Sequence, residues 1–308
     1  MNNKLLIVKF IFLFAFFSSS VISQAGAQNN GILPLTGLKY FNEGLASKGI
    51  EVKVDGSMLI SNRVPLNKEI EISFKQLNGF VESSNKTMYA GAEVVVLSPR
   101  GDVLFKDPNV LLRSKSNGFY ANDLKDFSIK FGIGADLIKG NFNGMLIIKL
   151  FDMKGKSQIR LEFPATFARP GERLQVSKNT KLIKSNVEAN GVINGLQVKG
   201  MKVDTDTSIK VAPRMAYTSV DISNIEGSSL AEIFQGKERF WVYDSKLNEV
   251  KITDILLKQV KGALENNTVN CMVKIPYRLK SNLKELYTVR YRWESLDKSQ
   301  VIDVVVTN

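Results

Sequence analysis

Short segments in which apolar and polar residues alternate dominate this sequence. Ile50–Val54 and Ile70–Phe74 each place apolar side chains on every second position, which is typical of a β-strand that is buried on one face. Two longer apolar segments, 94–105 and 145–163, are each interrupted by a turn-forming stretch that contains glycine. Each of these two segments is therefore predicted to form a β-hairpin.

Helical periodicity is scarce by comparison. It supports only two short helices, one in residues 38–45 and one in residues 230–234. Many short strands with few helices favour an all-β fold built from antiparallel sandwiches.

The second half of the chain repeats the first. Four segments have counterparts in the same order, at an offset that stays between 142 and 148 residues: 49–53 with 195–199, 70–74 with 218–222, 93–105 with 239–252, and 146–163 with 288–305. The repeat predicts two tandem antiparallel β-sandwich domains, immunoglobulin-like and of similar topology. They are expected to span residues 28–168 and 172–308, because Pro170 and Gly171 would end a strand and bend the chain between them.

Residues 1–27 have the pattern of a secretory signal peptide. Lys4 and Lys9 give a positive start, Phe10–Phe17 is a short apolar run, and small residues precede a cleavage site after Ala27. An uncut membrane anchor is the alternative, but the run falls well short of the roughly 20 residues that span a bilayer. No later stretch is long and apolar enough to be a transmembrane helix. The protein is therefore expected to be exported, to the periplasm, the cell surface or the medium.

The chemical inventory of the chain is narrow. It has no histidine and one cysteine, Cys271, so Ser-His-Asp and Cys-His catalysis and most catalytic zinc sites are excluded. The sequence has no glycine-rich phosphate loop, metal-ligand cluster or nucleophile elbow. We therefore expect no catalytic residue, no cofactor and no metal, and a buried, unreactive thiol at Cys271. Carboxylate-based glycoside hydrolysis needs no histidine and stays open.

The charge of the chain is positive but diffuse. The formal net charge is +12, which becomes +10 once Lys4 and Lys9 are removed with the signal (12 − 2 = 10). Nucleic-acid surfaces usually cluster their positive charge, and this chain has no basic tail or arginine-rich run. No nucleic-acid partner is expected. A diffuse positive surface instead favours weak association with acidic envelope polymers or an anionic membrane.

Large side chains occupy alternate positions of one segment near the C-terminus: Tyr287, Val289, Tyr291 and Trp293. This row could stack sugars, or it could form the core face of a strand. The repeat favours the core, because apolar Ile147 and Phe151 hold two of the equivalent positions in the first half. Trp241 and Tyr243, on the matching earlier strand, are assigned to the core for the same reason.

Arginines lie between the residues of this row. Arg290 and Arg292 are expected to face solvent, on the opposite side of the strand. Together with Arg169 at the domain boundary, they are the candidate contacts for an acidic partner. Two acidic clusters are assigned to ordinary polar turns: Asp204–Ser208, which lacks the glycine and distal glutamate of a calcium loop, and the pair Asp123 and Asp126.

Three functions fit this sequence. The first is a non-catalytic binding or structural module of the cell envelope, acting through protein or glycan contacts at the inter-domain cleft or at sheet edges. The second is a two-domain periplasmic chaperone or assembly factor. The third is a carboxylate-dependent enzyme that acts on polysaccharide.

The signal peptide generates a direct test. When the full chain is produced in cells that export it, the mature protein is expected to begin at Gln28, because cleavage after Ala27 satisfies the small-residue rule. Intact-mass measurement of the exported protein checks this. A protein that retains Met1 and fractionates with membranes would instead support the uncut anchor.

Overall fold

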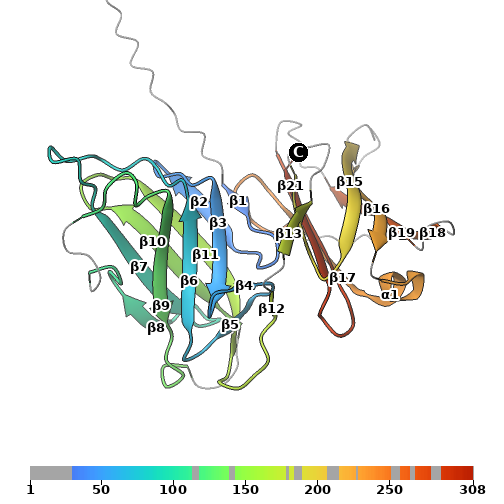
Figure 1. Cartoon of the computed structure of the whole chain (residues 1–308), viewed down its shortest axis with the longest axis horizontal. Coiled ribbons are helices and arrows are strands. Elements are labelled where there is room, and N and C mark those ends of the chain that lie inside the picture. The colour runs from blue at the N-terminus through green and yellow to red at the C-terminus, as the bar shows by residue number, and fades with distance from the viewer. Residues whose placement is uncertain are drawn as a thin grey trace, which may run out of the picture.

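The computed structural model describes residues 30–112, 118–138, 143–177, 180–183, 189–206, 215–226, 228–250, 257–263, 268–278 and 286–307. The predicted signal peptide lies outside these residues. The described chain forms two β-sandwiches that lie side by side (Figure 1). Within the described residues, we find no helix with the length and apolar character needed to cross a bilayer.

Two sheets face each other in the first sandwich. The strand order of one is β1 (Gly31–Ile32), β2 (Lys39–Glu43), β11 (Gln158–Ala168), β10 (Asn143–Asp152), β7 (Ala90–Leu97) and β8 (Val103–Asp107), with β5 (Arg63–Pro65) also pairing with β11. The order of the other is β12 (Val176–Ser177), β4 (Ser57–Leu59), β3 (Gly49–Val54), β6 (Glu69–Lys75) and β9 (Asp126–Gly132). The alternating segments of the sequence supply the inward-facing side chains of both sheets, among them Val52, Ile72 and Phe74.

The second sandwich is built in the same way. One sheet has the order β13 (Thr180–Ile183), β14 (Ala189–Asn194), β21 (Val301–Thr307), β20 (Thr288–Glu294) and β17 (Lys237–Tyr243). The other has the order β15 (Gln197–Asp206), β16 (Met215–Glu226), β19 (Thr268–Arg278) and β18 (Leu257–Ala263). A short helix, α1 (Leu230–Gln235), precedes β17.

The predicted duplication is confirmed by the strand order. The order β2-β11-β10-β7 of the first sandwich corresponds to β14-β21-β20-β17 of the second, and β3-β6-β9 corresponds to β15-β16-β19. Only one intervening strand changes sheets: β8 pairs with β7, whereas β18 pairs with β19. The all-β prediction and the similar topology of the two domains are therefore both correct.

The expected domain boundary is too early. Strand β12 pairs with β4, and Glu172 forms an ion pair with Arg63, so residues 172–177 pack on the first sandwich. The physical reason is the turn at Gly171, whose φ of 87° suits glycine. This turn folds the chain back along the first sandwich instead of releasing it.

Two smaller expectations are also wrong. Residues 38–45 contain strand β2 instead of a helix, because pairing with β11 outweighs a weak local preference. Asp204–Asp206 end strand β15 and do not form a turn, while the rest of that acidic cluster lies outside the described residues. The helix expected at 230–234 is confirmed as α1, which a capping box between Ser229 and Glu232 stabilises.

The single cysteine gives a test of the second core. Cys271 is 2% exposed and lies in the apolar cluster between the two sheets of the second sandwich. A thiol reagent is expected to leave Cys271 unmodified in native protein and to react rapidly in denaturant, because the thiol is shielded until this sandwich opens. Equally fast labelling in both conditions would contradict the packing of β19.

Candidate functional site

Strand β20 of the second sandwich is buried on both faces. Every residue of β20 is buried. Tyr291 and Trp293 point into the core, so the core interpretation of the aromatic row is confirmed. The residues between them face the first sandwich instead, which lies against the sheet that contains β20 (Figure 1).

The arginines of β20 are therefore not where the sequence placed them. Arg290 and Arg292 are 6% and 4% exposed, so the expectation that they face solvent is wrong. A strand that alternates apolar and charged residues normally has one face exposed to solvent. Here the second face is covered by a neighbouring domain. Arg169 is exposed, and a partner contact there stays a prediction.

Asp303 of β21 is the centre of a buried ion network. Its two carboxylate oxygens accept hydrogen bonds from Arg290 Nε and Nη2, at 3.0 and 2.7 Å, and Arg292 Nη1 bonds the second oxygen at 3.0 Å. Glu294 Oε2 accepts from Arg292 Nε and Nη2, at 3.2 and 3.0 Å. Burial alone would lower the pKa of Arg290, but the Asp303 carboxylate more than offsets it, so that pKa is raised. The Arg290 guanidinium is therefore charged.

Arg292 extends the network into the first sandwich. Its Nη1 and Nη2 donate to the backbone carbonyls of Leu35 and Ile60, each at 2.8 Å. With these bonds all five N–H groups of the guanidinium have acceptors. Gly37 permits the close approach of Arg290, because a Cβ atom there would lie 2.0 Å from Arg290 Nη1. The polar interaction therefore fixes the position of one sandwich on the other.

Apolar clusters lie on both sides of the network. One joins Leu35, Ile60 and Met58 of the first sandwich to Val301 of β21. The other joins residues of both sandwiches: Ile32, Phe41, Trp241, Tyr243, Leu247 and Val305. These clusters flank the ion pairs, and the burial of the charged groups strengthens the pairs and penalises any loss of one partner.

Trp241 and Tyr243 belong to this contact and not to the core of the second sandwich. Their neighbours Phe240 and Val242 point into that core, so the core assignment of Trp241 and Tyr243 chose the wrong face of β17. The guanidinium of Arg290 lies 4.7 Å from the centre of the Trp241 ring. Burial raises the pKa of Tyr243 to about 12, so its hydroxyl stays neutral.

A small polar cleft is left at this contact. It has a volume of about 190 Å³, and residues of both sandwiches line it, including Lys39, Arg239, Trp241 and Glu249. Lys39 Nζ donates to the Leu247 carbonyl at 2.7 Å, which crosses the mouth of the contact. Most of the polar groups that line the cleft already form hydrogen bonds with one another. The cleft is therefore mainly part of the contact that holds the two sandwiches together.

A second and larger hollow lies on the far side of the first sandwich. Strand β9 ends its sheet, with β6 on one side and, in the described part of the chain, no strand on the other. Its equivalent β19 has β18 at that position. A groove of about 820 Å³ follows β9, and six of the seven β9 residues line it. Figure 1 shows β8 and β9 on the side of the first sandwich that faces away from the second.

Apolar side chains line part of the groove, and exposed apolar residues lie close to them in the sequence. Side chains from β8, β9 and the segment that joins them line it: Phe105, Val110, Leu111, Phe119, Phe127 and Phe131. Next to these residues in sequence are three large side chains that water reaches: Val103, Leu112 and Tyr120, at 61%, 64% and 60% exposure. Exposed apolar residues gathered at one edge are a feature of protein contacts.

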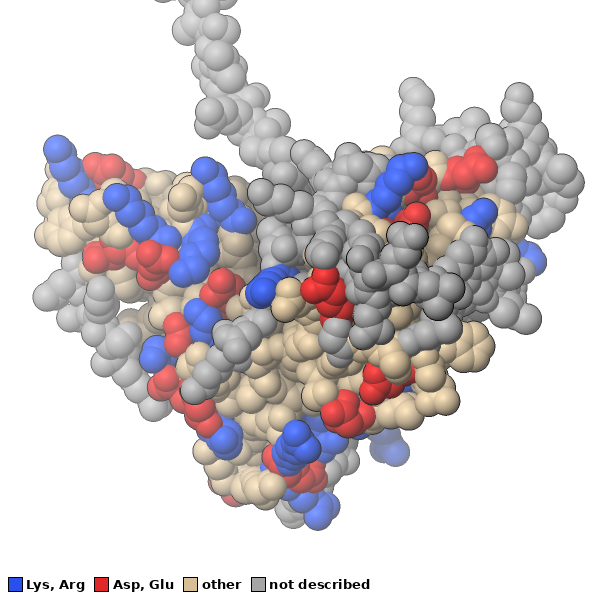
Figure 2. Space-filling view, turned by 45° about the vertical axis from the view of Figure 1, so that its right-hand side comes forward, with Lys and Arg blue, Asp and Glu red and all other residues tan. Residues whose placement is uncertain are grey.

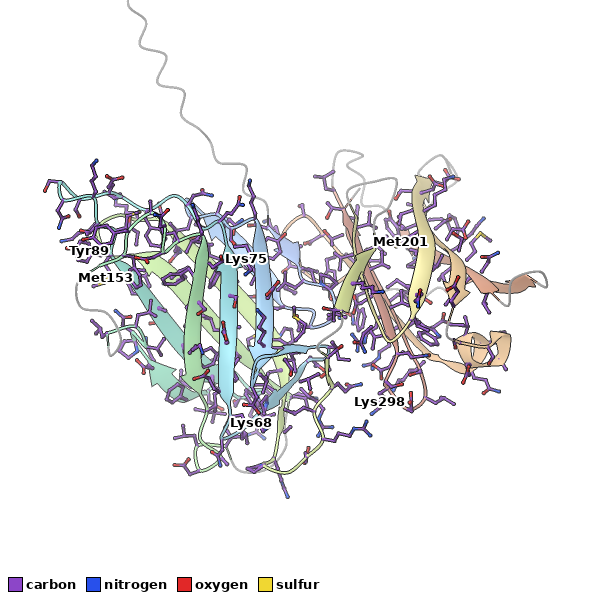
Figure 3. The ribbon with its side chains drawn as sticks, viewed as in Figure 1. Lys68, Lys75, Tyr89, Met153, Met201 and Lys298 are labelled. Carbon is purple, nitrogen blue, oxygen red and sulfur yellow. The ribbon has the colours of Figure 1, made fainter. Side chains whose placement is uncertain are left out.

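The charges around the groove are mainly negative. Lys75 Nζ bonds Asp126 at 2.7 Å and lowers the pKa of that carboxyl, and Lys130 bonds Glu69 at 2.9 Å. Figure 3 shows Lys75 at one end of β6 and Lys68 at the other. Within the described residues, the carboxylates of Asp107 and Asp123, which also line the groove, accept hydrogen bonds from the backbone N–H groups of Asn109 and Tyr120.

Comparisons with known proteins add little to this geometry. No family model matches the chain, and no curated protein matches it. Among the solved structures, a chain from the crystal structure of ICOS in complex with ICOS-L and an anti-ICOS-L VNAR domain aligns with 80% of this chain and 97% of its own length, at 9% identity and a TM-score of 0.23. At that score the likeness carries no argument, so the sandwich architecture rests on the sheets themselves.

The ion network predicts a large effect from a small substitution. Asp303→Asn removes the buried negative charge that holds Arg290 and Arg292, and it is expected to lower the free energy of unfolding by about 3–5 kcal/mol. Urea titration followed by tryptophan fluorescence measures this. Asp204→Asn is the matched control, because Asp204 pairs with Lys202 on the surface and should cost less than about 1 kcal/mol. Equal effects of the two substitutions would contradict the network.

Proposed function

We propose that this protein is an exported, non-catalytic binding module of the cell envelope, and that it contacts a partner protein at the groove between β8 and β9. The observation that carries the proposal is the edge of β9, which pairs with no further strand among the described residues and lies along a groove lined in part by apolar side chains. An unpaired edge offers backbone donors and acceptors to another chain, and the groove offers room for its side chains.

The arrangement of the domains supports this use of the molecule. The second sandwich is fixed to the opposite side of the first by the Arg292 contacts, so it leaves the groove accessible. Lysines, arginines and carboxylates are interspersed on the face drawn in Figure 2. A mixed surface of this kind favours a local, shaped contact over binding through one charged face.

Protein is a better-supported partner than glycan. The aromatic row that would stack sugars is buried, and one face of Trp241 is occupied by Arg290. The groove is lined instead by phenylalanine and aliphatic side chains together with polar and charged ones, among them Asp107, Asp123 and Lys130, a mixture that suits the side chains of a polypeptide.

A chaperone or assembly factor is the second candidate. It is favoured by the same missing neighbour of β9, because such a factor would complete its sheet with a strand of a client protein and later release it. The two functions differ in lifetime: a structural module keeps its partner, whereas an assembly factor exchanges it.

Site-specific photo-cross-linking in cells tests the proposal. A benzoylphenylalanine at Val103 is expected to give one discrete protein adduct, because this exposed residue lies two positions from Phe105, which lines the groove, and the same probe at Leu296 serves as the control. Leu296 is 72% exposed and belongs to the turn between β20 and β21.

Adducts that are the same at Val103 and Leu296 would contradict the proposal. So would a polysaccharide hydrolase activity of the purified protein that a single carboxylate substitution abolishes, because that result would establish the enzyme alternative. A pulse-chase version of the Val103 experiment separates a lasting partner from a transient client.

A further inference from the structure

The two sandwiches differ at the edge of the equivalent strands β9 and β19. In the second, β18 pairs with β19 over seven residues, Leu257–Ala263. In the first, the chain between β7 and β9 forms β8 on the opposite sheet, and the described residues place no strand next to β9. The groove therefore lies where the other copy of this fold holds one of its own strands.

We infer that a partner fills this position with an extended segment that pairs with β9 and carries lysine or arginine between apolar residues. The inference rests on the proposed function, since it assumes that the groove is the protein contact. It goes further in naming the mode of binding, which is strand addition, and the chemistry of the segment.

The length and lining of the groove suit one strand. The seven residues of β9 extend over roughly 23 Å at about 3.3 Å per residue. Along β9, the buried side chains of Phe127, Ile129 and Phe131 alternate with partly or fully exposed ones. An added strand would alternate in the same way, with one set of side chains over Phe105 and Val110 in the groove and the other set in water.

The charges near β9 determine which side chains are favoured in the second set, the one that faces water. On the outer surface of this edge, Glu69, Glu71 and Asp126 form ion pairs with Lys75 and Lys130, and the exposed Lys125 directly precedes Asp126. Asp107 and Asp123 add two carboxylates that have no ion pair within the described residues. The edge is therefore acidic on a protein whose overall charge is +12. A basic segment complements it, and an acidic segment is repelled.

Two synthetic peptides of nine residues test this inference on the full mature chain. One alternates valine with lysine and the other valine with glutamate, and fluorescence anisotropy measures their binding. The lysine peptide is expected to bind about tenfold more tightly, as a few partly exposed charge pairs allow. The double variant Glu69→Gln, Glu71→Gln removes carboxylates of the outer surface that the lysines would face, and it should remove most of that preference. Asp204→Asn, in the second sandwich, should leave it unchanged.

Methylated peptides test the pairing itself. The lysine peptide is made twice, with N-methyl groups on one alternating set of backbone nitrogens or on the other. Because only one edge of an added strand bonds β9, one methylated form should lose binding and the other should keep it. Circular dichroism confirms that each protein variant is folded.

The outcomes separate this inference from the function it rests on. Equal binding of both methylated forms, tighter binding of the glutamate peptide, or no peptide binding while Val103 still cross-links to a protein would each overturn strand addition by a basic segment and leave the proposed contact in place. If no protein adduct specific to Val103 forms, both this inference and the proposed function are overturned.

Discussion

The carboxylate of Asp303 carries no exposure to water and holds two arginines that are themselves buried. Removing such charges from water is costly, and the cost is offset only when every donor and acceptor finds a partner. Arg292 meets that condition by reaching two carbonyls of the other sandwich. A rotation or translation of one sandwich against the other would leave two N–H groups of a buried guanidinium without acceptors. The position of the two domains is therefore specified by polar groups, while the surrounding apolar clusters supply most of the buried area.

Because of this constraint, the two similar sandwiches have different roles. The second sandwich uses one sheet to hold the first, and its other sheet is completed by β18. The first sandwich is held at the end that bears β1 and β4, and its opposite edge at β9 pairs with no further strand in the part of the chain that the structure describes. The two sandwiches share one strand order, except that one strand pairs in the other sheet. As a result, the surface that joins the domains is separate from the surface that is free to bind.

Much of the fold could be predicted from the sequence, because strand alternation and the repeat are local signals. The contact between the domains could not, because alternation shows which side chains share a face but not what covers that face. For that reason, the alternation alone predicts that Arg290 and Arg292 face solvent. One signal was available: Asp303 is a lone charge in the apolar run VIDVVV, and the hairpin register places it opposite Arg292. The edge at β9 gives no sequence signal, since it depends on which sheet β8 joins.

The distance between the two sandwiches tests the central claim most directly. Spin labels at Val103→Cys and Leu296→Cys lie on exposed positions of different sandwiches, and the native Cys271 is too buried to be labelled. Double electron–electron resonance on the intact chain should give one narrow distance distribution that broadens when Asp303→Asn is added. A broad distribution in the protein with Asp303, or one that Asp303→Asn leaves unchanged, would contradict the account.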